Sequence, residues 1–137
     1  KSKEKDDFLE DDDIKEETIK NTDFRHVVYT GDYLQLVLMK LKPGEDIGVE
    51  THGNDQFFRF EKGTGEVHID NNLYEVTDGS AVVVPAGAKH NVINTSPVND
   101  LHMYTIYAAP HHLDGIHHKT KDAALKGDKP FDGKPTE

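Results

Sequence analysis

Short runs of alternating apolar and polar residues, with turn-forming residues between them, fill the chain from residue 25 to residue 108. A period of two indicates strands rather than helices. We expect strands at residues 25–30, 34–42, 56–61, 66–70, 73–76, 81–84, 90–94 and 101–108. Strands of this number and length predict an all-β fold, in which two sheets close into a jelly-roll barrel.

Residues 34–39 are apolar on both faces of their expected strand. One face can fill the barrel, whereas the other face needs to be covered. A second copy of the chain would cover it in a homodimer, and the N-terminal segment is the alternative.

Four side chains that can bind a metal lie on two separate segments. Glu50 and His52 project from the same side of a strand, about 7 Å apart along the backbone. Gln56 keeps this parity if the bend between them adds no residue, whereas a one-residue bulge would present Asp55 instead. His90 follows a Pro-x-Gly turn, which aims its side chain from a fixed corner. If the segments face each other, two imidazoles, one carboxylate and one amide oxygen form a set that suits Mn, Fe, Co, Ni, Cu or Zn.

The second segment resembles a signature of the cupin family, Gly-x5-Pro-x-Gly-x2-His-x3-Asn. It matches at every fixed position, namely Gly79, Pro85, Gly87, His90 and Asn94. The family's first signature is met in part, because Glu50 stands at its first His, His52 at its second His and Gln56 at its Glu. The resemblance implies a cupin barrel that binds a divalent transition metal such as Zn, Mn, Fe or Ni and that pairs into a homodimer.

The wider run, residues 36–119, is similar to small single-domain cupins of the mannose-6-phosphate-isomerase-like group. Glu50 and Gln56 together supply one carboxylate, so a bound divalent ion would keep a formal charge of about +1. The alternative is a chain that has lost the metal and keeps these polar residues as the lining of a pocket for a sugar or a small acid.

Aromatic side chains accompany the four predicted ligands. If Gln56 points inward, Phe58 and Phe60 do so too, and Tyr107 ends a strand near the mouth of the barrel. Aromatic residues beside ligands make a dry pocket, in which electrostatic interactions are strong. The alternative for these rings is that they fill the core.

Several His residues lie between residues 110 and 120. The resemblance to small cupins fits His112 and His118 best, and it implies that they lie across the barrel mouth as acid–base groups. His titrates near neutrality, which suits that role. The alternative is a capping loop whose imidazoles bond backbone carbonyls. His26, His68 and His102 occupy strand positions that look exposed, and we assign no role to them.

The length and net charge of the chain limit how many domains it can form and which partners it can bind. A chain of 137 residues suffices for one domain. We expect an acidic, flexible tail at residues 1–22, the barrel at 23–120, and a short helix with a C-terminal tail at 121–137. The formal charge of -10 disfavours nucleic acid and anionic membranes as partners. The absence of Cys fits a cytoplasmic protein, although a start at Lys1 leaves a removed signal peptide open.

Two classes of function fit these features. The first is a metal-dependent enzyme acting on a small hydroxy-carbonyl or sugar-like substrate, as an isomerase, epimerase or lyase in which the metal is a Lewis acid. The same ligands around iron would suit a non-haem dioxygenase. The second class is a non-catalytic module that binds a small molecule such as a sugar. We favour isomerase-like chemistry, and the sequence does not identify the substrate.

Overall fold

The computed structural model of the chain describes residues 13–136. In this part of the chain, nine strands and two short helices follow one another along the sequence. The order is α1 (Ile14–Lys20), β1 (Arg25–Thr30), β2 (Gln35–Leu41), β3 (Asp55–Lys62), β4 (Gly65–Ile69), β5 (Asn72–Val76), β6 (Ala81–Val84), β7 (His90–Asn94), β8 (Leu101–Ala108), β9 (His117–His118) and α2 (Lys121–Gly127). The molecule is mostly β, as the alternating pattern predicts.

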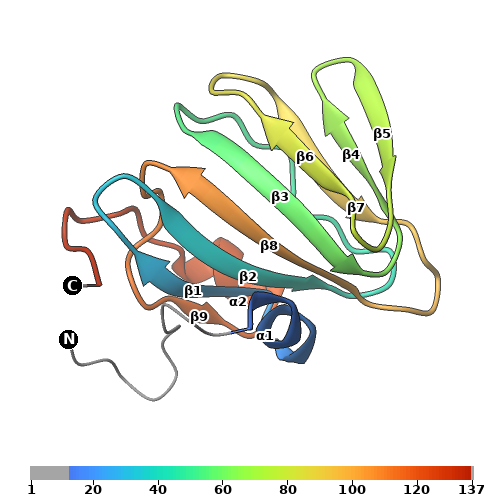
Figure 1. Cartoon of the computed structure of the whole chain (residues 1–137), viewed down its shortest axis with the longest axis horizontal. Helices are drawn as coiled ribbons and strands as arrows, with labels where there is room; N and C mark the ends of the chain where they lie inside the picture. Colours follow the sequence, from blue (N-terminus) through green and yellow to red (C-terminus); the bar gives the residue numbers. More distant parts are fainter. Residues whose placement is uncertain (1–12, 137) are drawn as a thin grey trace.

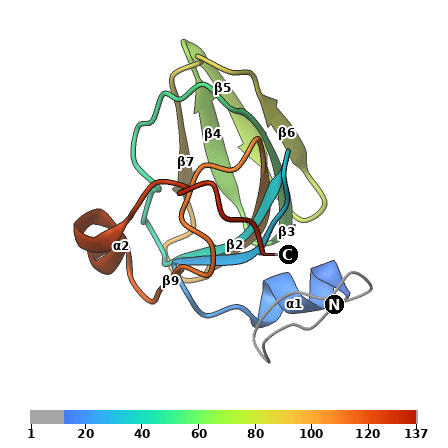
Figure 2. The ribbon, with the colours of Figure 1, turned by 90° about the vertical axis from the view of Figure 1, so that its left-hand side faces the viewer.

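The strands form two antiparallel sheets that face each other (Figures 1 and 2). The larger sheet has the order β6-β3-β8-β2-β1-β9, and the smaller has the order β5-β4-β7. Neighbours within a sheet are thus often far apart in sequence, which is the jelly-roll arrangement expected for a cupin barrel. The expected fold class is confirmed.

The expected strands coincide with β1 to β8, and their ends differ by no more than one residue. β9 was not predicted, because two residues are too few to display an alternating pattern. The short C-terminal helix was predicted, and it is present as α2. Its first turn is capped by Thr120, whose hydroxyl oxygen accepts a hydrogen bond from the backbone N–H of Ala123 (3.1 Å).

The core lies between the sheets and is built by alternating side chains. Along β8, every second residue from Leu101 to Tyr107 is buried and its neighbours are partly exposed. The same alternation in β3 buries Phe58 and Phe60, whose rings stack with centroids 6.0 Å apart. Burying an apolar side chain of this size stabilises the fold by about 1.5–3 kcal/mol. The alternation therefore fixes which face of each strand turns inward.

Two glycines allow the sheets to come together at the closed end of the core. Gly63 has a φ of +113°, and a Cβ atom there would lie 2.6 Å from the carbonyl oxygen of Asp100. A Cβ atom at Gly65 would lie 2.6 Å from the carbonyl oxygen of Ile93. Any side chain at these positions would collide with backbone, so the turn between β3 and β4 depends on glycine.

The helix α1 lies within the segment for which we expected an acidic tail. Asp13 caps it by accepting a hydrogen bond from the N–H of Glu16 (3.0 Å), and Thr18 is fully buried. The helix packs against β8 and β3, on the outer side of the larger sheet (Figure 2). Residues 1–12 of the expected tail lie outside the described residues. Neither helix in residues 13–136 is long and apolar enough to cross a membrane.

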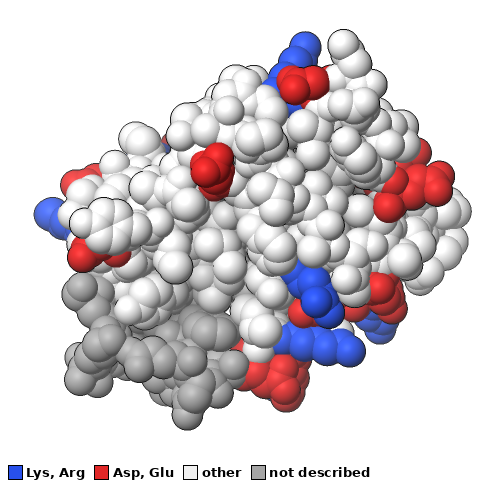
Figure 3. Space-filling view, turned by 45° about the horizontal axis from the view of Figure 1, so that its top comes forward, with Lys and Arg blue, Asp and Glu red and all other residues white. Residues whose placement is uncertain are grey.

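Charged side chains of both signs lie scattered over the face drawn in Figure 3, around a largely uncharged centre. The acidic excess of the chain does not gather into one patch on this face. The expectation that nucleic acid and anionic membranes are not partners rests on the net charge, and it stays a prediction.

Candidate functional site

The two motif segments are joined directly through their backbones. Glu50 and His90 exchange two hydrogen bonds, from N–H to carbonyl oxygen, of 2.8 and 2.9 Å. The N–H of Gly87, in the Pro-x-Gly turn, donates to the carbonyl oxygen of His52 (2.9 Å). Residues that exchange both bonds in an antiparallel pair carry their side chains on the same face. The side chains of Glu50 and His90 are therefore neighbours.

His52, Gln56 and His90 come together at this junction. The imidazole rings of His52 and His90 meet edge to face, with centroids 4.9 Å apart. Nε2 of His52 lies 3.0 Å from Oε1 of Gln56. The amide nitrogen of Gln56 donates to the hydroxyl oxygen of Thr105 on β8 (2.9 Å), which fixes the direction of the Gln56 oxygen. Asp55 is exposed, so it is Gln56 that points inward.

The pattern of bonded and unbonded nitrogens fits a metal ion. The Nδ1–H group of His90 donates to the carbonyl oxygen of Ala88 (3.0 Å), which leaves a lone pair on Nε2. Nε2 of His90 and Nδ1 of His52 are buried and have no hydrogen-bond partner within residues 13–136. A backbone carbonyl on one ring nitrogen is the usual support for a His that binds metal through the other.

Three further observations bear on whether these residues can bind a metal ion. Nε2 of His52 is hydrogen-bonded to the side-chain oxygen of Gln56 (3.0 Å), so this bond has to open before that nitrogen and that oxygen can bind one ion. Burial, together with the charge of His90, lowers the pKa of His52, so its ring is neutral at pH 7 and can act as a ligand. In the described residues, however, Glu50, His52 and His90 do not bring their ligand atoms all within 4.8 Å of one another. The assignment of these four ligands stays a prediction.

Tyr107 and His112 form a buried chain of polar groups behind this junction. Nε2 of His112 lies 3.1 Å from the phenol oxygen of Tyr107, and its Nδ1 lies 3.0 Å from Oδ1 of Asp128. Burial raises the pKa of Tyr107, which therefore stays a neutral phenol. Burial alone would raise the pKa of Asp128, but the hydrogen bond from His112 and the charges of His112 and Arg25 hold it below its ordinary value.

The structure separates the two His residues that we predicted as acid–base groups. His112 is buried, and both of its ring nitrogens are engaged by Asp128 and Tyr107. His118 pairs with Arg25 in the register of β1 and β9, and its ring lies near Arg25 and Asp128. Burial lowers the pKa of His118. His112 is thus linked to the motif junction only through Tyr107. His118 is further from the junction, because it lies near Asp128, on the other side of His112.

His111 is a residue of this site that the sequence did not single out. Its ring lies 4.8 Å from that of His52 and stacks on Tyr107 at 5.1 Å, measured between centroids. The backbone N–H of His111 donates to the side-chain oxygen of Gln35 (3.0 Å), which fixes the loop. Burial and the neighbouring His112 and His52 lower its pKa to about 4. Only the run of adjacent His residues hinted at it, because the loop has no period that tells which ring points inward.

The three aromatic residues predicted to line a pocket are all buried. Phe58 and Phe60 belong to the hydrophobic core between the sheets. Tyr107 is the one whose ring faces the motif junction, with its centroid 5.5 Å from that of His52. A hollow of about 490 Å³ lies behind His90, on the outer face of the smaller sheet, because Lys89 and Asn91 project away from the face that carries His90. It is also lined by Val49, His68, Asp70, Asn71, Lys89 and Asn91.

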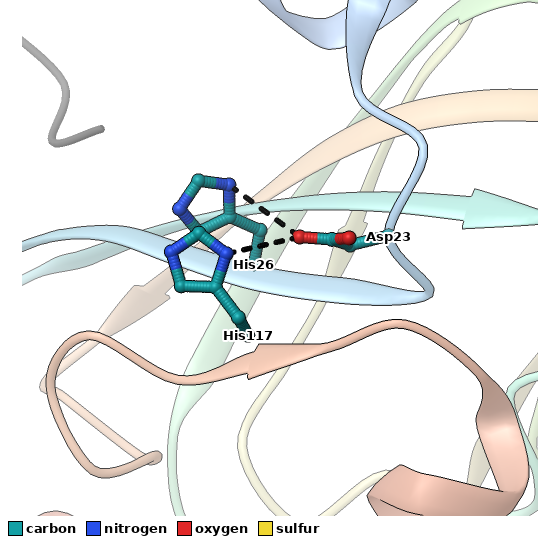
Figure 4. A group of neighbouring side chains, drawn as sticks. All are labelled: Asp23, His26 and His117. Carbon is teal, nitrogen blue, oxygen red and sulfur yellow. Dashed lines mark hydrogen bonds and ion pairs between the residues drawn. The ribbon is translucent and has the colours of Figure 1, made fainter. Parts of the chain in front are cut away.

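A second group of potential ligands lies elsewhere, on β1, on β9 and in the turn just before β1. Asp23, His26 and His117 bring one carboxylate oxygen and two ring nitrogens within 4.8 Å of one another, which could hold a metal ion (Figure 4). Within residues 13–136, this is the group of three acidic or His side chains whose ligand atoms all lie within this distance of one another. No spacing in the sequence links these residues, and the sequence analysis assigns no role to His26.

Comparisons with known proteins match most of the chain. The family described as Cupin domain matches residues 37–107, a segment that contains both motif segments. The crystal structure of BH2720 from Bacillus halodurans is 42% identical, with a TM-score of 0.82 over 88% of this chain and 94% of that chain.

Two curated relatives are described as uncharacterized proteins. YrkC of Bacillus subtilis (strain 168) is 46% identical over 119 residues, and L612 of Acanthamoeba polyphaga mimivirus is 44% identical over 106 residues. The matches cover 82% and 74% of this chain. They cover 63% of YrkC and 66% of L612, so the chain spans just under two thirds of the length of each relative.

Proposed function

Since the chain belongs to the cupin family, we propose that it binds a divalent transition metal ion between the two motif segments and acts there on a small hydroxy-carbonyl or sugar-like molecule. His52 and His90 would bind the ion through ring nitrogens, and Gln56 through its side-chain oxygen. Glu50, whose charge acts on His52, would supply the carboxylate. Zn, Mn, Fe and Ni are metals that such a mixed nitrogen and oxygen set suits.

One observation carries this proposal. Two imidazoles lie edge to face, and each has a buried ring nitrogen without a hydrogen-bond partner among the described residues. A buried polar atom without a partner costs about 1–3 kcal/mol. Two such atoms on neighbouring rings support a site that is completed by something which accepts nitrogen lone pairs, and a metal ion does so.

A bound divalent ion would act as a Lewis acid on a substrate oxygen, which makes the neighbouring C–H proton easier to remove. The chain would supply the group that accepts this proton. His111 is placed for this role, because its ring lies next to that of His52; its lowered pKa of about 4 keeps it neutral at pH 7 but makes it a weak base. Tyr107 stacks on His111 and so holds its orientation.

The residues behind Tyr107 would position it rather than touch substrate. His112 binds the phenol, and Asp128 binds His112, so the ring of Tyr107 is fixed at both its oxygen and its face.

The metal-binding part of the proposal is tested by removing single ligands. We expect Gln56→Ala and His90→Ala each to weaken metal binding at this site tenfold or more, because each removes a donor atom. Chelator-stripped protein is titrated with Zn²⁺, and the metal bound per chain is then measured by elemental analysis. The control is His68→Ala, on β4, which pairs with Glu66 outside the junction. Unchanged affinity in both pocket variants would refute the ligand assignment.

The reaction is tested with the metal-loaded protein. We expect conversion of a hydroxy-carbonyl compound, such as a sugar phosphate, and a loss of turnover of at least tenfold in His111→Ala with metal binding retained. Oxygen consumption by the iron-loaded protein with a catechol or thiol would instead support a dioxygenase. Saturable sugar binding without any conversion would support a binding module.

A further inference from the structure

We propose that Asp23, His26 and His117 form a second site for a divalent transition metal ion, distinct from the junction of the motif segments. On β1, His26 points away from the face that carries Val27 of the core. The site therefore lies on the outer side of the larger sheet. It does not depend on the function proposed above.

The fold places the three side chains by three separate means. His26 and His117 are partners in the register of β1 and β9, so their side chains lie on the same face. Asp23 lies just before β1, where the side chain of Asn21 accepts from its N–H (3.2 Å) and donates to its carbonyl oxygen (2.9 Å). The N–H of Phe24 donates to the carbonyl oxygen of Lys119 (3.2 Å), which ties this turn to the end of β9.

The distances between the donor atoms fit a small metal ion. Both Nδ1 atoms approach the same carboxylate oxygen, Oδ2 of Asp23, at 3.1 Å for His117 and 3.9 Å for His26 (Figure 4). Ligand atoms around a tetrahedral Zn²⁺ with bonds of about 2.0–2.1 Å lie about 3.3–3.4 Å apart. The observed distances lie on either side of this value, so small side-chain rotations suffice to complete the site.

The charge of the group also suits a cation. Burial alone would raise the pKa of Asp23, but hydrogen bonds from Lys119 and His117 hold it below its ordinary value, so the carboxylate is ionised at neutral pH. Lys119 binds the other oxygen, Oδ1, at 2.8 Å, which orients the carboxylate and leaves Oδ2 facing the rings. Its positive charge also opposes a metal ion, so we expect moderate rather than tight binding.

The donor types indicate which ions the site would take. Two imidazoles with one carboxylate are ligands for Zn²⁺, Ni²⁺, Co²⁺ or Cu²⁺, whereas Mg²⁺ and Ca²⁺ prefer oxygen atoms only. The side chain of His117 is 39% exposed, so an ion can reach the site from solvent, and water can fill the remaining coordination position. The competing interpretation is a cluster in which protonated His117 and Lys119 neutralise Asp23 without any metal.

The first test counts bound metal in matched variants. Full-length protein is stripped with chelator, titrated with Zn²⁺ at pH 7.5 and measured by isothermal titration calorimetry and elemental analysis. We expect His117→Ala and Asp23→Asn each to lose one equivalent of Zn²⁺, while His90→Ala keeps that equivalent. The control is His68→Ala, which removes a partly exposed His elsewhere. Full stoichiometry in both His117→Ala and Asp23→Asn would overturn the proposal. If these variants lose one equivalent of Zn²⁺ but no Zn²⁺ binds at the motif junction, only the function proposed above is refuted.

The second test separates metal binding from simple charge neutralisation. Lys119→Met removes a positive charge beside the carboxylate, so we expect Zn²⁺ to bind several-fold more tightly to this variant. A charge-neutralised cluster without a metal site predicts no binding in either protein. Binding should also weaken as the pH falls from about 7.5 to about 5.5, because the imidazoles must be neutral to bind metal. Affinity unaffected by both Lys119→Met and pH would contradict the site.

Discussion

At the scale of single residues, the amide of Gln56 decides the electrostatics of the motif junction. Its nitrogen donates to Thr105, and its oxygen faces His52 at 3.0 Å. A carboxylate at the same position could accept hydrogen bonds from both neighbours and would add a full negative charge. Gln56 stands where the cupin signature has Glu, and it therefore changes the charge of the proposed metal site while keeping its shape.

We accordingly expect Gln56→Glu to bind Zn²⁺ at least tenfold more tightly than the natural chain. The added charge lies close to the ion, in surroundings of low dielectric, where attraction is strong. The measurement is a competition titration against a chromogenic chelator, with the isosteric Gln56→Met as the control that removes the oxygen. Affinity equal in the natural chain and in Gln56→Glu would mean that residue 56 does not contact the ion.

The contacts of His52 with Gln56 and His90 could be predicted from the sequence for a definite reason, whereas the four-ligand set with Glu50 stays a prediction. Strand parity puts Glu50 and His52 on one side, and the fixed spacing around the Pro-x-Gly turn aims His90 at them. His111 was not accessible, because its loop has no period. Its backbone N–H is held by the side chain of Gln35, which is 76 residues away in the sequence.

At the scale of elements, the alternating pattern predicted β1 to β8, and strands such as β3 and β8 show the reason, because alternate residues of each are buried in the core. Which strands become neighbours was not predictable, since the pairing of β1 with β9 depends on the path of the whole chain. The group of Asp23, His26 and His117 follows from this pairing, with 94 residues between Asp23 and His117. A search by spacing cannot find such a group.

Asp128, at the C-terminal end of α2, links this helix to the loop before β9 and to β1. It accepts a hydrogen bond from buried His112 and lies 3.5 Å from Arg25. Its carboxylate is partly exposed, so solvent screens part of this interaction. The packing of α2 against the barrel therefore depends in part on one charge.

We expect Asp128→Asn to lower the free energy of unfolding at pH 7 by about 1 kcal/mol, after a discount for its exposure. A depressed carboxyl pKa stabilises the fold above the unfolded pKa, near 3.8, and this contribution is lost as the pH falls through the folded value. The difference between the two proteins should therefore narrow below about pH 4. Urea unfolding at several pH values measures it, with Asp122→Asn, an exposed residue of the same helix, as the control. A difference that persists at pH 2 would show that the effect is not electrostatic.

At the scale of the whole molecule, two edge strands with exposed apolar side chains lie on the open side between the two sheets. β5 ends the smaller sheet and β6 ends the larger one, and both lie on the same side of the barrel (Figure 1). Leu73, Tyr74 and Val83 on these edge strands are about half exposed or more. Unpaired edges with exposed apolar side chains tend to associate with another chain. The helix α1 belongs to the N-terminal segment that was the alternative cover for residues 34–39, and it packs on the outer side of the same sheet, against β8 and β3.

We therefore propose that the chain forms a homodimer through β5 and β6, rather than through the outer face of β2. Val83→Glu and Leu73→Glu would each place a charge in this contact and should shift the protein towards a monomer at micromolar concentration. Light scattering coupled to size-exclusion chromatography gives the mass, and unchanged circular dichroism would verify folding. The control is Val98→Glu, which alters an equally exposed residue in the loop before β8. If the natural chain is monomeric at the highest soluble concentration, or if Val98→Glu dissociates it equally well, the edges are not the interface.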